Sequence, residues 1–362
     1  MDSVKIGIAK RGNLTEEIGI ISGLIGVEIL HGVIMVLLSY IMGLGLDQFS
    51  LIVFSTFFSF LFLLPISLIF ERELWPKKLT IKFMVQLVLI AFTGTTLFQS
   101  LLLRGLKMTS PALSAAMPNL TPAFIFIIAW VFRLEKVNLS CLYSKLKILG
   151  TLLCVVGAAA MSIMISTTTQ SADPVASSSP SPPTNIFDLK KIIGCLYLIT
   201  AVIALSSSLA LQAYTLGDFH APITLSALQS LAGSILTALA ELCQEQKFDV
   251  GWPAVTIVSL IGFTLLIGTL NGMAVSFTTW AMKKRGPVLV SMFGPIATVA
   301  SALLAVIFLG DTIKIGSLPG MFVMFGGLYL VLWAKRKEGY TCNISKEIVI
   351  DDSDAEKPLL AD

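Results

Sequence analysis

The chain has 362 residues, of which 55% are hydrophobic and 13% are charged. A soluble globular chain carries about 25% charged residues, and a single water-soluble core cannot enclose so large an apolar excess. The formal net charge of +3 is too small to indicate a nucleic-acid partner. The composition therefore excludes an ordinary soluble domain and predicts a protein that lies in a lipid bilayer.

Apolar runs long enough to cross a bilayer recur along the chain, with polar segments between them. They are uniformly apolar and about twice as long as the strands of a membrane barrel, so they predict α-helices. The expected spans are 18–43, 50–70, 81–103, 111–132, 147–167, 192–214, 221–241, 255–279, 288–309 and 315–334. The predicted fold class is all-α integral membrane, with ten transmembrane helices.

Polar segments divide the chain into parts. Residues 1–17 lack the cleavage pattern of a signal peptide, and we expect a cytoplasmic N-terminus. Residues 168–191 are rich in Ser, Pro and Thr, which predicts a disordered linker outside the cytoplasm, and 335–362 predict a disordered cytoplasmic tail. Two units of five spans each remain, 18–167 and 192–334.

The basic residues predict the topology, because Lys and Arg concentrate in cytoplasmic loops. With the N-terminus inside, most basic residues fall on the cytoplasmic side, and both termini are predicted to be cytoplasmic. Those on the other side are Arg104, Lys107, Lys190, Lys191, Lys247 and Lys314. Leu359 and Leu360 only approximate a sorting signal, so the plasma membrane is the first expectation and the vacuolar membrane the second.

The two halves contain an internal repeat. Residues 110–135 align without a gap with 286–311, so that Pro111 meets Pro287 and Phe132 meets Phe308. Because each half has an odd number of spans, the second copy enters the membrane in the opposite orientation. The sequence therefore predicts an inverted repeat, which is typical of carriers that open alternately to each side.

Three stretches resemble the plant UMAMIT proteins, which are walls-are-thin-related, nodulin-like members of the drug/metabolite transporter superfamily with two EamA repeats. They are LKMTSPALSAAMPNLTPAFIFIIAWVFRLEKV, KILGTLLCVVGAAAM and KKRGPVLVSMFGPIATVASALLAVIFLGDTIKIGS. The resemblance covers roughly residues 17–340. It implies two inverted five-helix EamA-type repeats around a central cavity, and movement of amino acids or vacuolar export of auxin. Ser206–Ser208 and Thr278 depart from the residues usual in that family, which bears on substrate identity.

Prolines interrupt matching spans of the two halves. Pro118 and Pro122 lie in the fourth span and Pro295 lies in the ninth. Proline cannot donate a backbone hydrogen bond, so carbonyls are released at Ser114 and Ser291. Broken helices in corresponding positions are typical of a midplane substrate site, and the alternative is a kink that only shapes packing.

Uncharged polar side chains within the spans are candidates for binding the carboxylate and ammonium groups of a solute. The alternative is that they bridge helices through interhelical hydrogen bonds. These substrate-binding candidates are Gln99, Asn119, Thr121, Gln212 and Asn271.

Glu28 and His31 form the ionisable pair deep in a span, and their spacing places them on one helix face. A carboxylate at this depth is costly, so it should face a cavity or be protonated. Since imidazole titrates near neutral pH, the pair is a candidate proton relay or substrate contact. The alternative is a Glu to His contact that only fixes the first helix.

The predicted function is secondary transport of a small solute. An amino acid is the first expectation, and auxin or another small organic acid is the second. No HExxH, GxSxG or P-loop pattern indicates an enzyme, and a receptor is a remote alternative. A nucleotide-sugar or phosphate exchanger would require basic residues inside the spans, whereas those of this chain lie at span ends. The five cysteines show no paired spacing, so they indicate neither a zinc site nor a disulfide framework. No metal, cofactor or nucleic-acid partner is expected.

Overall fold

The computed structural model describes residues 2–43, 48–74, 80–109, 117–131, 189–245 and 257–309, and parts of 145–160 and 319–334. Helices make up nearly all of these ranges, and no strand occurs within them. Most of the predicted linker and the whole predicted tail lie outside the described residues. Apolar sequence in a bilayer must satisfy its backbone polar groups within each segment, and a helix does so.

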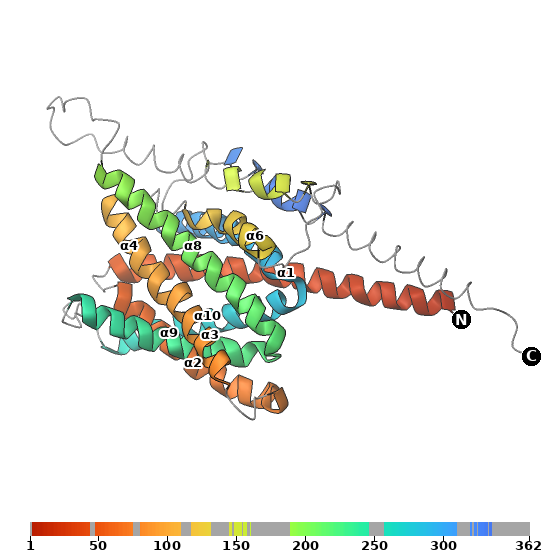
Figure 1. The fold of residues 1–362 in the computed structure, drawn as a ribbon, viewed down its shortest axis with the longest axis horizontal. Helices are drawn as coiled ribbons and strands as arrows, with labels where there is room; N and C mark the ends of the chain where they lie inside the picture. The colour runs from red at the N-terminus through yellow and green to blue at the C-terminus, as the bar shows by residue number, and fades with distance from the viewer. Residues whose placement is uncertain are drawn as a thin grey trace, which may run out of the picture.

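The first half contains three long spans and part of a fourth. The third span is one continuous rod that changes from α-helix to π-helix and back (Figure 1). Its elements are α1 (Asp2–Gly43), α2 (Gln48–Phe70), the short 3₁₀ turn η1 (Arg72–Leu74), α3 (Ile81–Ala91), the π-helix η2 (Phe92–Leu97), α4 (Phe98–Met108), the 3₁₀ turn η3 (Met117–Leu120) and α6 (Thr121–Val131).

The second half repeats this order without the π-helix. Its elements are α8 (Leu189–Asp218), α9 (Pro222–Glu245), α10 (Ile257–Arg285), the short α11 (Pro287–Ser291) and α12 (Gly294–Leu309). Helix α8 begins three residues before the expected start of the sixth span, and α1 extends back through most of the polar N-terminal segment. Neither difference moves a predicted span.

Within the described residues, seven helices are long and apolar enough to cross a membrane. They match the predicted spans one to three and six to nine, and shorter apolar helices at Met117–Ile128 and Ile148–Gly157 match the fourth and fifth. The described positions of 319–334 are helical and correspond to the tenth. The predicted fold class, a ten-helix membrane protein, is therefore confirmed.

The contacts between helices close into a ring that alternates between the halves. Its order is α1, α10, α2, α9, the rod α3 to α4, α8, α6 and the pair α11 and α12, which returns to α1. Helices α4 and α8 lie side by side in Figure 1. Exchanging the halves maps the ring onto itself. The contact of α1 with α12 corresponds to that of α8 with α6, and the contact of α2 with α10 corresponds to that of α9 with α3. The packing thus has the pseudo-twofold symmetry of an inverted repeat.

Small residues allow the closest approaches in this ring. A Cβ atom added at Gly268 of α10 would lie 2.7 Å from the Ser55 carbonyl oxygen of α2, and one at Gly32 of α1 would lie 2.9 Å from the Ser301 nitrogen. Backbone atoms cannot move aside as a flexible side chain does. Glycine at these positions therefore sets the distance between spans, as is common in helix packing within membranes.

Candidate functional site

The two broken helices meet where their breaks occur. In the first half the chain passes through η3 before α6 begins, and in the second α11 ends at Ser291 and α12 begins at Gly294. Thr298 Oγ1 of α12 donates a hydrogen bond of 3.0 Å to Asn119 Oδ1 of η3. Asn119 is buried. This hydrogen bond joins the fourth and ninth spans at the point where both lose regular helical bonding.

The internal repeat places this contact on the pseudo-twofold axis. In the gapless alignment Asn119 corresponds to Pro295, and Thr298 corresponds to Pro122. Exchanging the halves therefore maps the pair Asn119 and Thr298 onto the pair Pro295 and Pro122. Each of the two residues thus lies within one helical turn of the position equivalent to its contact partner, so the contact lies near the axis that relates the copies, which in an inverted repeat runs in the membrane plane.

The prolines act differently from the predicted kink in a continuous helix. Pro122 and Pro295 each lie at the second position of a new helix, where the missing N–H costs no helical bond. The chain before α12 turns tightly, with the Ile296 N–H bonded to the Phe293 carbonyl at 2.8 Å. Pro118 lies within η3, and Ser114 lies outside the described residues. The helices thus end before these prolines and restart at them.

Two candidate residues present buried oxygen atoms without a hydrogen-bond partner among the described residues. They are Thr121 Oγ1, which follows η3, and Gln99 Oε1 of α4. Leaving such a group unpaired costs about 1–3 kcal/mol. These atoms are therefore available to a polar ligand or to water.

Glu28 and His31 form the contact that their spacing predicts. His31 Nδ1 lies 3.3 Å from Glu28 Oε2, and Glu28 is 6% exposed. Glu28 precedes the close contact of Gly32 with Ala300 and Ser301 by about one turn, and Thr298 lies about one turn from the same contact along α12. The carboxylate is thus held near the level of the Asn119–Thr298 hydrogen bond.

Gln212 lies in a hydrogen-bonded cluster of the second half. Its Nε2 donates to Gln229 Oε1 at 3.0 Å and to Thr279 Oγ1 at 3.1 Å. Ser226 Oγ lies 2.9 Å from the same Thr279 oxygen. Both amide hydrogens of Gln212 are engaged, so the cluster bridges α8, α9 and α10. This geometry favours the bridging alternative for Gln212.

Asn271 lies on the face of α10 that points away from lipid. Met273 is 54% exposed, and two residues correspond to a rotation of about 200° on a helix, so Asn271 lies on the opposite face. Asn271 is half-buried. The described candidates therefore occupy four places: the broken helices with Glu28, α4 with Gln99, the inner face of α10, and the Gln212 cluster.

Sequence reasoning missed the partners of these side chains. Thr298, Gln229 and Thr279 each complete a pair with a predicted residue, yet a lone polar residue in a span carries no signal of its partner. The alignment of the halves contained one clue, because it places Thr298 opposite Pro122. Among the described residues no group of three His, Cys, Asp or Glu side chains could hold a metal ion.

Charged side chains gather at one end of the helix ring. Lys82 pairs with Asp218 at 2.7 Å, Lys284 with Glu16 at 3.0 Å and Arg285 with Glu17 at 3.1 Å. At the same end the Glu71 carboxylate accepts hydrogen bonds from the backbone N–H groups of Ile223 and Thr224, which open α9. The ends of α1, α2, α8 and α10 that meet here are those that the basic residues assign to the cytoplasm.

Comparison with known proteins decides the family. The model of the EamA-like transporter family matches residues 18–163 and 192–333. The chain belongs to the EamA-like transporter family. This EamA-like protein is 48% identical to WAT1-related protein At5g47470 of Arabidopsis thaliana over 349 residues, and the alignment covers 96% of this chain and 94% of that relative. It is 43% identical to WAT1-related protein At4g16620 of Arabidopsis thaliana, and that alignment covers 97% of this chain and 99% of the relative.

Other matches agree with this assignment. Protein WALLS ARE THIN 1 of Arabidopsis thaliana is 28% identical, covering 82% of this chain and 78% of that one. A solved crystal structure superposes with a TM-score of 0.61 at 17% identity, covering 88% of this chain and 99% of that one, which shows the fold. The resemblance to the walls-are-thin-related plant proteins is confirmed. The family of this chain is therefore one of membrane transporters, which take small-molecule substrates.

Proposed function

We propose that this EamA-like protein is a secondary carrier that moves an amino acid across the plasma membrane by alternating access. The observation that carries the proposal is the hydrogen bond between Asn119 and Thr298, which joins the two broken helices near the axis relating the repeats. Rocking one repeat against the other changes the distances around such an axis least. A solute bound there stays in place while access changes from one side to the other.

The candidate side chains suit a zwitterion. Near the contact, Thr121 Oγ1 supplies an unpaired oxygen atom, Asn119 supplies an amide, and Glu28 supplies a carboxylate that can accept from an ammonium group. Gln99 Oε1 of α4 is a second unpaired oxygen atom. No described lysine or arginine lies deep in a span, which argues against a multiply charged phosphate ester. Auxin or another small organic acid at the vacuolar membrane is the second candidate, since its single carboxylate requires fewer partners.

We further propose that Glu28 and His31 couple transport to protons. The pair lies close to the proposed solute site, and its imidazole and carboxylate are in contact at 3.3 Å, so a proton can pass between them. Both termini are assigned to the cytoplasm, because the charged end of the ring carries the basic residues that the positive-inside rule places there. Proton entry and solute binding would then share one polar region.

The test is uptake by proteoliposomes from a panel of radiolabelled amino acids and indole-3-acetate, with and without a pH gradient. We expect one class of solute to show uptake, acceleration by unlabelled solute on the opposite side, and stimulation by the gradient. Glu28→Gln should abolish the stimulation and weaken solute binding, so that counterflow persists only at a higher solute concentration. Glu73→Gln, which changes an exposed glutamate outside the spans, is the matched control. Uptake without acceleration by solute on the opposite side would indicate a channel and contradict the carrier.

A further inference from the structure

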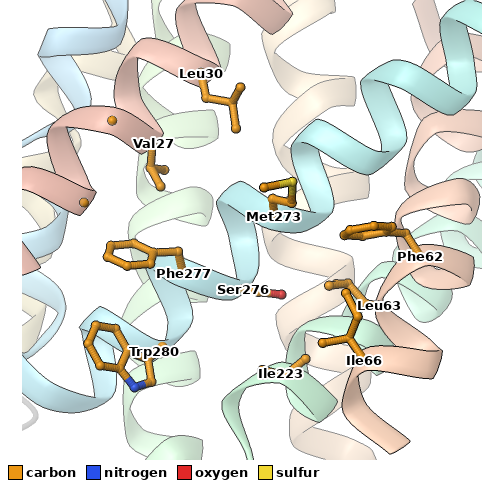
Figure 2. Close-up of a pocket in the computed structure, with 12 residues that line it drawn as sticks. Val27, Leu30, Phe62, Leu63, Ile66, Ile223, Met273, Ser276, Phe277 and Trp280 are labelled. Carbon is orange, nitrogen blue, oxygen red and sulfur yellow. The ribbon is translucent and has the colours of Figure 1, made fainter. Parts of the chain in front are cut away.

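An apolar groove of about 600 Å³ lies between α1 and α2, with α10 as its floor (Figure 2). Its walls are Val27 and Leu30 of α1 and Phe62, Leu63 and Ile66 of α2. Figure 2 shows Met273, Ser276, Phe277 and Trp280 of α10 between these walls, with Ile223 of α9 at one end. None of the substrate-binding candidates lines this groove.

The groove faces the side of the ring that lipid occupies. Asn271 and Glu28 lie about 200° around their helices from Met273 and Gly26, which line the groove. Met273 is 54% exposed, and Gly26 is exposed as well. The polar interior and the groove are therefore on opposite faces of the same two helices, and a solute in one does not contact the other.

The lining selects a hydrocarbon ligand. Its residues include no titratable side chain, so it offers nothing to pair with a zwitterion or a carboxylate. The one hydroxyl is Ser276 Oγ, which is buried without a hydrogen-bond partner among the described residues. Phe62, Phe277 and Trp280 supply flat apolar surfaces. At this depth of the bilayer the available ligand of matching chemistry is an acyl chain.

The end of the groove adds positive charge. Trp280 is followed on the same face of α10 by Lys284, and Lys283 lies beside it at the end of the helix. Lys283, Lys284 and Arg285 face two glutamates, Glu16 and Glu17, which leaves an excess of one positive charge. Lys284 keeps 49% of its side chain exposed. An indole at the interface followed by exposed ammonium groups matches a lipid whose headgroup is anionic.

We propose that this groove binds one anionic phospholipid, with an acyl chain along α10 and its phosphate near Lys283 and Lys284. Under the proposed topology the site lies in the cytoplasmic leaflet, where anionic lipids are enriched. The bound chain covers the seam between α1 of one repeat unit and α10 of the other. A lipid held there contacts helices of both repeats. The lipid composition of the membrane therefore bears directly on the movement of one repeat against the other.

Gly26 provides a specific way to close the groove. A Cβ atom added at Gly26 has no atom within 4 Å, and neither has one added at Gly19 on the same helix, outside the groove. Gly26→Leu should therefore fill the groove without disturbing the packing of the helices, and Gly19→Leu is its matched control. Met273→Phe at the mouth of the groove is a second variant, which serves if Gly26→Leu does not reconstitute.

The test measures quenching of Trp280 by phospholipids with brominated acyl chains, in vesicles of phosphatidylglycerol or phosphatidylcholine. The Trp280 signal is the difference between the full chain and its Trp280→Phe variant.

We expect a relative binding constant about fivefold higher for phosphatidylglycerol than for phosphatidylcholine, which is the contribution of one basic side chain at an anionic surface. Gly26→Leu and Met273→Phe should remove this preference and Gly19→Leu should retain it. Lys283→Gln, which removes the excess positive charge, should equalise the two lipids. Equal quenching in the wild type, or no change on filling the groove, would mean ordinary boundary lipid only and overturn the proposal. Uptake plays no part in this readout, so its outcome is independent of the proposed transport.

Discussion

The third span and its counterpart, the eighth, have the same place in the ring but different backbones. Helix α10 runs without interruption from Ile257 to Arg285, whereas the third span contains the π-helix η2 between α3 and α4. In the register of the repeat, Gly94 of η2 corresponds to Leu270 and Thr95 corresponds to Asn271. Ser208 Oγ of α8 donates to the Ile90 carbonyl at the start of η2 at 2.9 Å. The copies thus share their packing partners while one of them has acquired a local irregularity.

This difference indicates which features the symmetry requires and which are free to diverge. The order of helices around the ring is the same in both halves, because each unit can bury its faces only against the other. Within the described residues, the π-helix, the hydrogen bond between Asn119 and Thr298, and the Gln212 cluster have no counterpart in the other half. π-Helical segments concentrate at functional sites. We therefore expect the asymmetric features to affect transport and the symmetric ones to affect folding.

The largest expected effect is at a symmetric contact. Gly268→Leu would drive a side chain against the Ser55 carbonyl oxygen and Phe58 Cβ, at 2.7 and 2.6 Å from its Cβ. Overpacking against backbone should cost about 3 kcal/mol, seen as a lower melting temperature or loss of the monodisperse peak in detergent. Gly262→Leu on the same helix, where an added Cβ meets nothing within 4 Å, should behave as wild type. Equal effects of the two changes would contradict this account of the packing.

A smaller effect is expected at Glu71, which lies at the end of α2 beside the start of α9. Its carboxylate accepts from the Thr224 N–H and hydroxyl at 2.8 Å each, and from the Ile223 N–H at 3.1 Å. Glu71→Gln removes the charge from these bonds and from the positive end of α9, at a cost of about 2 kcal/mol. The exposed neighbour Glu73 is the control, and Glu73→Gln should leave the melting temperature unchanged. If both variants melted alike, Glu71 would not stabilise the pair of helices.

The smallest expected change in stability occurs at the π-helix. Ser208→Ala removes the donor to the Ile90 carbonyl, which in a membrane contributes about 0.6 kcal/mol. Gly94→Ala places a methyl group 2.3 Å from Ser208 Oγ, so it should be worse alone than combined with Ser208→Ala. Transport by Ser208→Ala should slow while solute affinity holds, measured as initial rates in proteoliposomes. If the losses of stability caused by Gly94→Ala and Ser208→Ala were additive, Ser208 would not interact with the π-helix.

The sequence predicts the spans well because the bilayer imposes one requirement on every segment. Runs such as 50–70 and 192–214 differ from the observed helices only at their ends. The site is less predictable: Asn119 and Gln212 were identified as polar residues within spans, but Thr298 and Gln229 were not identified as their partners. Hydrogen bonds between distant segments depend on the ring order and on helix rotation. The π-helix lies beside a hydrogen bond from Ser208 of α8 to the Ile90 carbonyl, and no local pattern of residues 92–97 reveals this contact.

The central claim is that the two repeats have opposite orientations, and equivalent residues test it most directly. Lys107 and Lys283 correspond in the repeat, and both are exposed at helix ends. Gly194 lies close to Thr109 near the start of α8, whereas Lys283 bonds to the His220 carbonyl beyond the end of α8. Single cysteines at the two positions in a cysteine-free chain would be labelled with an impermeant maleimide in sealed cells and in inverted vesicles. We predict labelling from opposite sides, with Lys283→Cys reached from the cytoplasm. Labelling of both from one side would contradict the inverted repeat and remove the basis for alternating access.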